Sequence, residues 1–421
     1  MASEPRTPAG EAEEVRADGE AARRILQARE PIGWRLGLER MRRLCSLLGM
    51  PQNRFASIHV VGTNGKTSVA RMSAALLEAQ GIRAGAYLSP HITSWRERIM
   101  IAGEPIPEAD FEAALERVEQ SAQVADRSAG EEGPVTQFEL VTAAAFVAFA
   151  DARVQVAAIE AGLGGRLDAT NVIPSKVTVL TSVGLDHTEW LGETLEEIAA
   201  EKLAVLRDHT MLVVGDVPPE AAKVVEGESK RHHVEPIHVS GGRSYPERNL
   251  GVAIAAATVL IGRDAASPVG TAIPGRAEIV GDDPVQIFDA AHNADGARAL
   301  AAALPDLGGG RDVVCCLAIL AEKDATEIVA GLSPVCSRFV CTQIPEEAIR
   351  GSGRPVADSH SAAGLAEICW AAGAEAEAVE DPIDAWRRAR ELAHERDGAA
   401  LATGSHYLLS CIWTERPAPN F

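Results

Sequence analysis

The sequence lacks any run of about 18 apolar residues, the length that a helix needs to cross a membrane. The N-terminal residues also lack the apolar stretch of a signal peptide. Basic residues are in the minority, with 40 Lys and Arg against 60 Asp and Glu and a formal net charge of −20. Because nucleic acid binds to basic surfaces, this balance argues against nucleic acid as the main partner. We therefore expect a cytoplasmic protein without a membrane partner, in which local positive groups and backbone N–H donors hold any anionic substrate.

The cysteines form no CxxC pair and no regular framework. The seven cysteines are Cys45, Cys315, Cys316, Cys336, Cys341, Cys369 and Cys411. Scattered cysteines with mostly apolar neighbours are typical of reduced core residues in a cytoplasmic protein. They do not predict a zinc site.

The length of 421 residues is too great for one ordinary core and favours two or three domains. Residues 1–25 are rich in Glu, Ala, Pro and Gly, and we interpret them as a disordered extension. The rest of the chain divides near residue 273, after a stretch with several glycines and prolines. This division gives an N-terminal domain over residues 26–273 and a C-terminal domain over residues 274–421.

Apolar runs typical of strands alternate with helical patterns in both predicted domains. The predicted strands are 58–61, 154–159, 177–182, 211–214, 285–289, 313–318, 339–342 and 400–402. The predicted helices include 33–50, 68–79, 194–206 and 250–261. Strands that alternate with helices imply a mostly parallel sheet covered on both faces. The sequence thus predicts two α/β domains with a cleft between them.

A glycine loop between a predicted strand and a predicted helix has the pattern of a phosphate cradle. It consists of Gly62, Thr63, Asn64, Gly65, Lys66, Thr67 and Ser68. Glycines let backbone N–H groups turn toward phosphate oxygens, and the helix N-terminus adds partial positive charge. Lys66 would reach the β- and γ-phosphates of ATP, and the hydroxyl of Thr67 or Ser68 would face Mg²⁺. The standard pattern has a glycine where this sequence has Val60, so a purely structural glycine turn is the alternative.

Further motifs follow this loop in a fixed order. They are 85–91 (GAYLSPH), 96–99 (RERI), 103–106 (GEPI), 137–139 (QFE), 160–171 (EAGLGGRLDATN), 184–187 (GLDH), 201–202 (EK), 274–276 (PGR), 289–293 (DAAHN) and 323–324 (KD). In this order the motifs resemble the folylpolyglutamate/dihydrofolate synthases, a branch of the Mur ligase family. The likeness covers roughly residues 33–207 and 274–410.

The resemblance implies a P-loop ATPase domain with a mostly parallel sheet, joined to a smaller Rossmann-like C-terminal α/β domain, with the site in the cleft. It also implies an ATP-dependent ligase that adds L-glutamate to dihydropteroate, to a (tetrahydro)folate, or to both. In that reaction the acceptor carboxylate takes the γ-phosphoryl group of ATP and becomes an acyl phosphate. The amine of glutamate then attacks, giving an amide, ADP and phosphate.

The resemblance also gives roles to matching positions. The expected magnesium ligands are Ser89, Glu160, His187 and Lys202, the last of these as a carbamylated lysine. The expected catalytic residues are Lys66, Lys202, His187 and Arg276. The expected nucleotide contacts outside the loop are Arg276, Asp289 and His292. The expected cofactors are therefore ATP and Mg²⁺, with two metal ions flanking the transferred phosphoryl group.

The residues alone leave plainer interpretations open. Glu160 could simply be capped by backbone amides, although an acid before a glycine turn at a strand's carboxyl end lies where α/β sheets bind ligands. Lys202 could belong to a surface Glu–Lys pair on an amphipathic helix. A lysine cation beside magnesium would be repelled, whereas a lysine carbamate could bind a metal ion. His187 could be an ordinary hydrogen-bonded histidine, and Arg276 could form a linker salt bridge.

Departures from the family pattern favour other functions as alternatives. Thr67 stands where the family's loop usually has glycine, as in the cell-wall Mur ligases, and the segment 208–250 is short. A Mur-like amide ligase acting on a non-folate carboxylate is one alternative, and a non-catalytic nucleotide-binding protein is another. Lost catalysis is disfavoured by the joint presence of Lys66, Glu160, His187, Lys202 and Asp289. We expect small-molecule substrates and a monomer.

Overall fold

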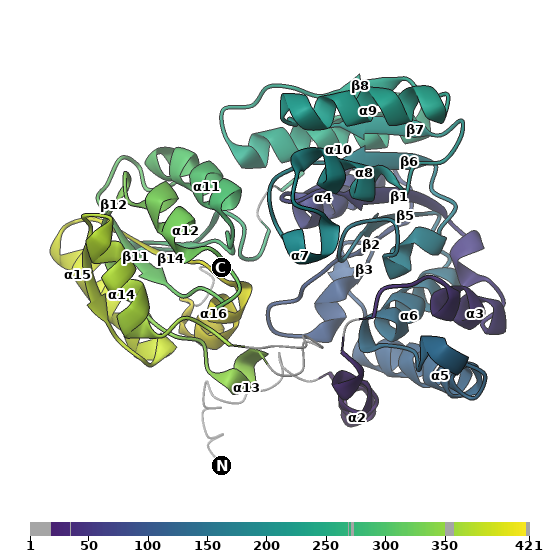
Figure 1. Cartoon of the computed structure of the whole chain (residues 1–421), viewed down its shortest axis with the longest axis horizontal. Helices are drawn as coiled ribbons and strands as arrows, with labels where there is room; N and C mark the ends of the chain where they lie inside the picture. The colour runs from purple at the N-terminus through teal and green to yellow at the C-terminus, as the bar shows by residue number, and fades with distance from the viewer. Residues whose placement is uncertain (1–17, 34, 268, 271–272, 350–357, 418–421) are drawn as a thin grey trace, which may run out of the picture.

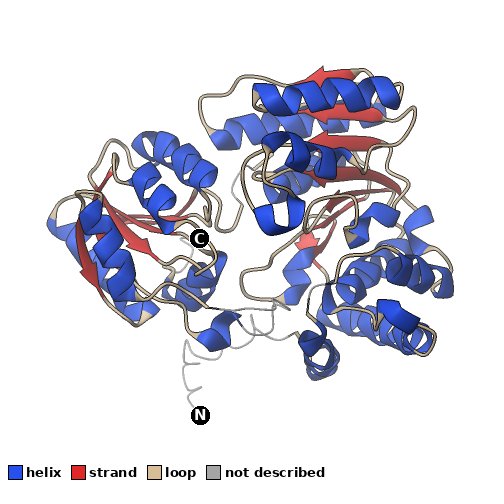
Figure 2. Ribbon diagram, in the orientation of Figure 1, coloured by secondary structure: helices blue, strands red, loops and turns tan. Residues whose placement is uncertain are grey.

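The computed structural model describes residues 18–33, 35–267, 269–270, 273–349 and 358–417. The chain forms two lobes, each built on one sheet with helices on both faces (Figures 1 and 2). Most strands in both sheets are parallel, which confirms the predicted α/β class. Within the described ranges, no helix is both long and apolar enough to cross a membrane.

The N-terminal lobe has an eight-stranded sheet with the order β4-β3-β2-β5-β1-β6-β7-β8. Its strands are β1 (Ala56–Val61), β2 (Ala84–Tyr87), β3 (Ile99–Ile101), β4 (Glu104–Pro105), β5 (Val156–Glu160), β6 (Val177–Leu180), β7 (Met211–Val214) and β8 (Pro236–His238). Only β3 and β4, at one edge, are antiparallel to their neighbours. The central strands β1 and β5 are buried almost throughout, as expected for parallel strands covered on both faces.

Helices cover both faces of this sheet. They are α2 (Glu20–Arg29), α3 (Glu39–Leu47), α4 (Lys66–Ala79), α5 (Glu108–Asp126), α6 (Gln137–Asp151), α7 (Thr188–Leu191), α8 (Leu195–Leu203), α9 (Pro219–Arg231) and α10 (Tyr245–Ile261). One face packs against α4 and α10 in a single core. The other face packs against α2, α3, α5 and α6 near β2, and against α8 and α9 near β7. Helix α7 lies on the side that faces the C-terminal lobe (Figure 1).

Helix α6 shows how the sequence sets the packing of this lobe. Its residues are apolar on nearly every side, so the helix is buried beneath others instead of lying on the surface. A capping box between Thr136 and Glu139 fixes its N-terminus. Glu139 also forms a buried ion pair with Arg40 of α3, with the nitrogen and oxygen 3.0 Å apart. The pair therefore ties α3 to the buried helix.

The C-terminal lobe has a six-stranded sheet with the order β13-β12-β11-β14-β10-β9, in which only β9 is antiparallel. Its strands are β9 (Glu278–Asp282), β10 (Val285–Phe288), β11 (Val313–Leu317), β12 (Cys336–Cys341), β13 (Glu375–Ala378) and β14 (Ala399–Thr403). Its helices are α11 (Ala294–Leu307), α12 (Ala325–Leu332), α13 (Glu346–Ile349), α14 (Ala362–Ala371), α15 (Pro382–Glu395) and α16 (His406–Ile412). Helices α11, α12 and α14 pack on one face, and α13, α15 and α16 on the other.

The predicted disordered extension over residues 1–25 is wrong in its last part. Helix α2 begins at Glu20 and packs on α5, with Ala22 and Leu26 buried. Its last residue, Arg29, pairs with Glu119 at 2.9 Å, so tertiary contacts hold a helix whose polar composition suggests none. Residues 1–17 lie outside the described residues.

Other predicted elements have different bounds in the structure. The helix predicted over 33–50 begins only at Glu39, and residues 35–38 are not helical. Between residues 208 and 274, where the sequence indicates the helix 250–261, the structure contains α9 as well as α10, and the short strand β8. The last strand of the first sheet, β8, ends before residue 273, and the first strand of the second sheet, β9, begins after it.

Candidate active site

A cavity of about 670 Å³ lies between the two lobes. Residues just after the carboxyl ends of β1, β5, β6, β10 and β14 line it. In α/β proteins, ligands bind at this edge of a parallel sheet because loops and helix N-termini converge there. The two sheets therefore present their usual ligand-binding edges to one shared cleft.

The predicted phosphate loop joins β1 to α4 and is held by the end of β6. Gly62 has a φ of 152° and no room for a Cβ, which would collide with the Thr181 hydroxyl. That hydroxyl donates to the carbonyl of Asn64 at 2.6 Å, and the Ser182 hydroxyl accepts from the Asn64 N–H at 2.9 Å. Gly65, with a φ of 85°, passes close to Asn249 of α10. These contacts fix the loop independently of any ligand.

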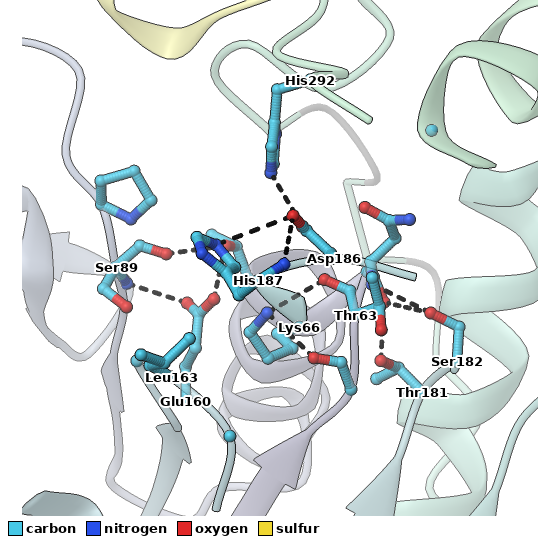
Figure 3. Close-up of a pocket in the computed structure, with 18 of the residues that line it drawn as sticks. Thr63, Lys66, Ser89, Glu160, Leu163, Thr181, Ser182, Asp186, His187 and His292 are labelled. Carbon is cyan, nitrogen blue, oxygen red and sulfur yellow. Dashed lines mark hydrogen bonds and ion pairs between the residues drawn. The ribbon is translucent and has the colours of Figure 1, made fainter. Parts of the chain in front are cut away.

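Two lysines converge on this loop, and Figure 3 shows the contacts of one of them, Lys66. The Lys66 ammonium donates to the carbonyl oxygens of Gly62 at 3.1 Å and Thr63 at 3.0 Å. The Lys202 ammonium, from α8, donates to the same Gly62 oxygen at 2.9 Å. Lys202 is buried, and burial together with the nearby Lys66 charge lowers its pKa to about 7. The surface Glu–Lys pair considered for Lys202 is therefore wrong, because the side chain points inward.

Glu160, at the end of β5, lies beside the loop on its other side. Its carboxylate accepts from the Ser89 N–H at 2.9 Å and from the Thr67 hydroxyl at 3.0 Å. It forms no ion pair within the described part of the chain. Burial raises its pKa to about 7, against the lowering effect of the Lys66 charge. A buried carboxylate of this kind is stabilised by a cation placed next to it.

Asp186 joins the two lobes at the centre of the cleft. Its carboxylate accepts from Lys323 at 2.5 Å and from the Asn293 amide at 3.0 Å, and lies 3.7 Å from the His292 ring. Burial alone would raise the pKa of Asp186, but the contacts with His292 and Lys323 keep it well below its usual value. Its neighbour His187 has a left-handed φ of 51° at the start of α7 and also lines the cavity.

Asn293 forms the second connection between the lobes. It caps α11 by accepting from the Gly296 N–H at 2.8 Å. Its side-chain amide also pairs with that of Asn64 in the phosphate loop, at 3.1 and 3.2 Å. The N-terminus of α11 is thus hydrogen-bonded directly to the loop.

The linker between the lobes carries Arg276 and contacts Asp289. One Asp289 oxygen accepts from the Tyr245 hydroxyl of α10 and from the Ala277 N–H, and the other accepts from the Ala291 N–H. The Arg276 side chain lines the cavity and donates to the Gly275 carbonyl at 3.1 Å. Asp289 therefore orients the turn that carries Arg276, and Arg276 forms no salt bridge with a described residue.

The long glycine block after β5 supports the helix that carries Lys202. A Cβ at Gly165 would lie 2.6 Å from the carbonyl oxygen of Lys202, so only glycine allows this approach to α8. Asp168 accepts from the Leu163 N–H at 2.9 Å and the Thr170 N–H at 3.0 Å. Asp168 thus braces its own loop.

The structure brings the predicted site residues to one cavity. Those that line it are Gly62, Thr63, Asn64, Gly65, Lys66, Thr67, Ser68, Ser89, Glu160, His187, Lys202, Arg276, Asp289 and His292. Sequence reasoning gave no role to Asp186, Lys323, Asn293 and Tyr245, which connect the lobes. The available signal for Asp186 was its place in the motif 184–187, six residues after the buried strand β6, but its partners are distant in the sequence. Within the described residues, no three His, Cys, Asp or Glu side chains are grouped to hold a metal ion.

A P-loop that opens into a cleft closed by a second α/β lobe defines the class of ATP-dependent Mur-type ligases. Residues 60–244 match the Mur ligase middle domain, and residues 275–406 match the Mur ligase glutamate ligase domain. Within that class, the chain belongs to the dihydrofolate synthase/folylpolyglutamate synthase family. It is 36% identical over 358 residues to the dihydrofolate synthase/folylpolyglutamate synthase of Mycobacterium tuberculosis, covering 72% of this chain and 74% of the relative. It is 33% identical over 420 residues to the folylpolyglutamate synthase of Lacticaseibacillus casei, covering 88% of this chain and 92% of the relative.

Solved structures of the family share this fold. The folylpolyglutamate synthase of Mycobacterium tuberculosis complexed with ADP aligns with a TM-score of 0.82 and 30% identity, covering 94% of this chain and 99% of that one. The bifunctional folylpolyglutamate synthase/dihydrofolate synthase of Yersinia pestis complexed with AMPPNP and a Mn ion aligns with a TM-score of 0.74 and 27% identity. The alignment covers 91% of this chain and 94% of that one. The likeness extends over both lobes, so it includes the cleft between them.

Proposed function

We propose that this chain adds L-glutamate to dihydropteroate, to a tetrahydrofolate, or to both, at the expense of ATP. The observation that carries the proposal is the convergence of the phosphate loop, Glu160 and Lys202 on one cavity that the C-terminal lobe closes. Making an amide from a carboxylate and an amine in water is unfavourable, so the carboxylate is first phosphorylated. The reaction is then mainly a matter of positioning and of neutralising charge.

ATP would bind with its phosphates in the phosphate loop. Lys66 now donates to two loop carbonyls and would turn to the β- and γ-phosphates when these are present. Asn64 is hydrogen-bonded to Asn293 at the N-terminus of α11 and would hold the phosphate loop in a fixed position relative to the C-terminal lobe. Arg276 has a cavity-lining guanidinium without an ionic partner in the described chain, which suits a developing phosphate charge.

The residues around Glu160 fit a divalent cation. Mg²⁺ prefers hard oxygen ligands, and the Glu160 carboxylate, the Ser89 and Thr67 hydroxyls and the phosphate oxygens of ATP would supply them. Glu160 is buried without an ion pair in the described chain, so a cation beside it would remove an unfavourable charge. Bound there, Mg²⁺ would neutralise charge on the phosphoryl group during its transfer. His187 stays a proposed ligand on the same cavity.

Lys202 is proposed to act as a carbamate that binds a second metal ion. As an ammonium it shares the Gly62 carbonyl with Lys66, which brings two like charges together. Carbamylation joins the neutral amine to carbon dioxide and releases a proton, and the resulting anion would attract Lys66. The lowered pKa of Lys202 supports this, because a neutral amine is accessible near pH 7.

The C-terminal lobe would complete the site. Asp289 and His292 are proposed nucleotide contacts. Asp289 also orients the Arg276 turn, and the His292 ring lies 3.7 Å from the Asp186 carboxylate. When the glutamate amine attacks the acyl phosphate, the new C–N bond forms as the C–O bond to phosphate breaks. The amine must lose a proton in this step. Exclusion of water from the closed cleft would protect the acyl phosphate from hydrolysis.

Thr67 favours a second candidate, a Mur-like ligase for another carboxylate. The Thr67 hydroxyl binds Glu160 directly, so it has a place in the site that a glycine could not fill. The family relationship gives the folate reaction priority. The cytoplasmic location and the monomeric state expected from the sequence stay predictions.

A mass-resolved ligase assay tests the proposal. Purified protein is incubated with ATP, Mg²⁺ and L-glutamate, with dihydropteroate in one tube and tetrahydrofolate in another. We expect a product heavier by one glutamyl unit in at least one tube, with an equal amount of phosphate released. Absence of product in both tubes, from protein that still binds ATP, would contradict the folate reaction and favour the other carboxylate.

A further inference from the structure

Arg98 is a buried cation in the cleft for which the reaction outlined above has no use. It ends the short 3₁₀ turn Trp95–Arg98, directly before β3, and only 6% of its surface is exposed. What remains exposed faces the cavity between the lobes, which Arg98 lines together with Ser89 and Trp95. A guanidinium stays charged in proteins, so burial of this group must be compensated.

The immediate neighbours of Arg98 are neutral. Its Nε donates to Nδ1 of His91 at 3.0 Å, and its guanidinium carbon lies 4.2 Å from the centre of the Trp95 ring. His91 accepts this hydrogen bond, so its Nδ1 carries no proton. Burial, and secondarily the Arg98 charge, holds the pKa of His91 well below its ordinary value. Neither ring supplies a negative charge.

Two acids lie near Arg98, Glu97 in the sequence and Glu160 in the site, and both accept hydrogen bonds from other groups. Glu97 accepts from the N–H groups of Ile92, Thr93 and Ser94, each at 2.9 Å. Glu160 accepts from Ser89 and Thr67. Across the described ranges Arg98 has no ion pair, and neither of its terminal nitrogens has a hydrogen-bond partner. Two parallel N–H donors on a planar group are thus left for a ligand.

We propose that Arg98 binds a carboxylate group of a substrate, and this inference rests on the proposed ligase function. The paired N–H donors of a guanidinium match the two oxygens of a carboxylate. The phosphates of ATP already have the phosphate loop with Lys66. The position also suits a second substrate, because the loop of Arg98 touches the C-terminal lobe: Ile92 packs against its core, and Tyr407 lines the same cavity.

The incoming amino acid is the favoured source of this carboxylate. Dihydropteroate has one carboxylate, which the reaction consumes, so it offers no permanent anion. Glutamate retains both carboxylates through amide formation, because it reacts through its amine. A fixed carboxylate would orient its amine toward the acyl phosphate, and this orientation is a large part of catalysis for two reacting groups.

The test compares steady-state constants of Arg98→Gln and Arg98→Lys with the wild type. Arg96→Gln is the matched control, because Arg96 lies in the same turn, donates to the Ile106 carbonyl and does not line the cavity. We expect the KM for L-glutamate to rise about 10- to 100-fold in Arg98→Gln, the effect of losing a charge-assisted hydrogen bond. Arg98→Lys should keep part of the affinity. The KM for ATP should change less than about twofold in both variants, which also shows that the fold is intact.

The outcomes separate the two sources of carboxylate. A rise confined to the KM for L-glutamate assigns the site to the amino acid, and a rise confined to the KM for tetrahydrofolate assigns it to the acceptor's own glutamyl carboxylate. Unchanged KM values for both, or an effect on ATP alone, would overturn the inference. If the wild-type protein forms no product, the proposed ligase function is wrong. This result differs from unchanged KM values in active variants, which would overturn only the inference about Arg98.

Discussion

At the scale of single residues, the site depends on one backbone carbonyl that receives two ammonium groups. Lys66 and Lys202 both donate to Gly62, and neither forms an ion pair with a described residue. This arrangement is unfavourable for two cations but favourable for a cation and an anion. It gives the proposed carbamate at Lys202 a physical reason that the sequence alone could not supply.

Replacing Lys202 with Ala should therefore lower kcat by about 100-fold or more, the effect of losing a group that stabilises charge during the reaction. Acetate should restore part of the activity, because a small carboxylate can occupy the vacated space and bind the metal ion. The measurement is phosphate release with and without acetate. Glu201→Gln, one residue away on α8 and paired with Arg166, should respond little to either change. Rescue by chloride as effective as by acetate would contradict the carbamate.

His59 gives a prediction for pH. Burial, with a smaller effect of the Arg207 charge, lowers its pKa to about 3, and its Nε2 contacts the Thr170 hydroxyl at 2.8 Å. Below the unfolded pKa of about 6.5, the His59 imidazole is protonated in the unfolded chain but stays neutral in the folded chain. The stability that neutral His59 preserves is thus present above about pH 6.5 and is lost as pH falls toward 3.

This loss is measurable by urea unfolding at pH 7, 6 and 5. His59→Gln should weaken the pH dependence by up to about 1.4 kcal/mol per pH unit. His238→Gln is a suitable control, because that side chain is exposed at the edge strand β8. Equal slopes for His59→Gln and the wild type would mean that His59 does not set the pH dependence.

At the scale of elements, the glycine block and α8 act as a pair. Gly165 lies against the backbone carbonyl groups of Glu201 and Lys202 in α8. Gly165→Ala should push the helix away, lower stability by about 1–3 kcal/mol and displace Lys202, so kcat should fall as well. Gly227→Ala, on the open side of α9, should leave kcat unchanged and stabilise its helix by about 0.5–1 kcal/mol. Thermal unfolding and phosphate release measure the two effects, and full activity of Gly165→Ala would contradict the coupling.

Some elements could be predicted from the sequence and others could not, for physical reasons. A buried apolar run, two glycines and a helical period coincide at β1, the phosphate loop and α4, so all three were predictable. The edge strands β9 and β13 are largely half-exposed and carry Glu and Gly. Their pairing depends on the neighbouring strands β10 and β12, not on their own composition.

The same distinction applies to the site. Lys66 and Glu160 lie in local patterns, a glycine loop and a strand end, so the sequence indicated them. Asp186 and Lys323 are 137 residues apart, and their ion pair exists only because two lobes meet. The family resemblance contained both residues but gave neither a role, because their function depends on tertiary contact.

At the scale of the whole molecule, polar contacts connect the two lobes, beside the apolar contact of Ile92 with the core of the C-terminal lobe. Asp186 binds Lys323 and Asn293, Asn64 binds Asn293, and Tyr245 binds Asp289. Polar contacts of this kind can be exchanged for water when the lobes separate. The cleft is therefore suited to opening for substrates and closing around them.

Lys323→Met tests this account of the cleft. It leaves Asp186 buried without its lysine partner, and breaking a buried ion pair in this way costs about 3–5 kcal/mol in a closed protein. Because separation of the lobes returns Asp186 to water, we expect an open cleft, not an unfolded chain. Small-angle scattering with ATP and Mg²⁺ should give a larger radius of gyration than the wild type, with a raised KM for ATP. Arg298→Gln, an exposed position on α11, should match the wild type; an equally compact Lys323→Met would contradict the account.

The central claim, that the acceptor carboxylate is phosphorylated by ATP before the amide forms, is tested most directly with an oxygen label. The acceptor is prepared with ¹⁸O in its reacting carboxylate and turned over with ATP, Mg²⁺ and L-glutamate. The mechanism predicts one ¹⁸O atom in each phosphate released, because the oxygen that attacks the γ-phosphorus leaves with it. Unlabelled phosphate alongside amide product would contradict an acyl phosphate and, with it, the role given to the phosphate loop.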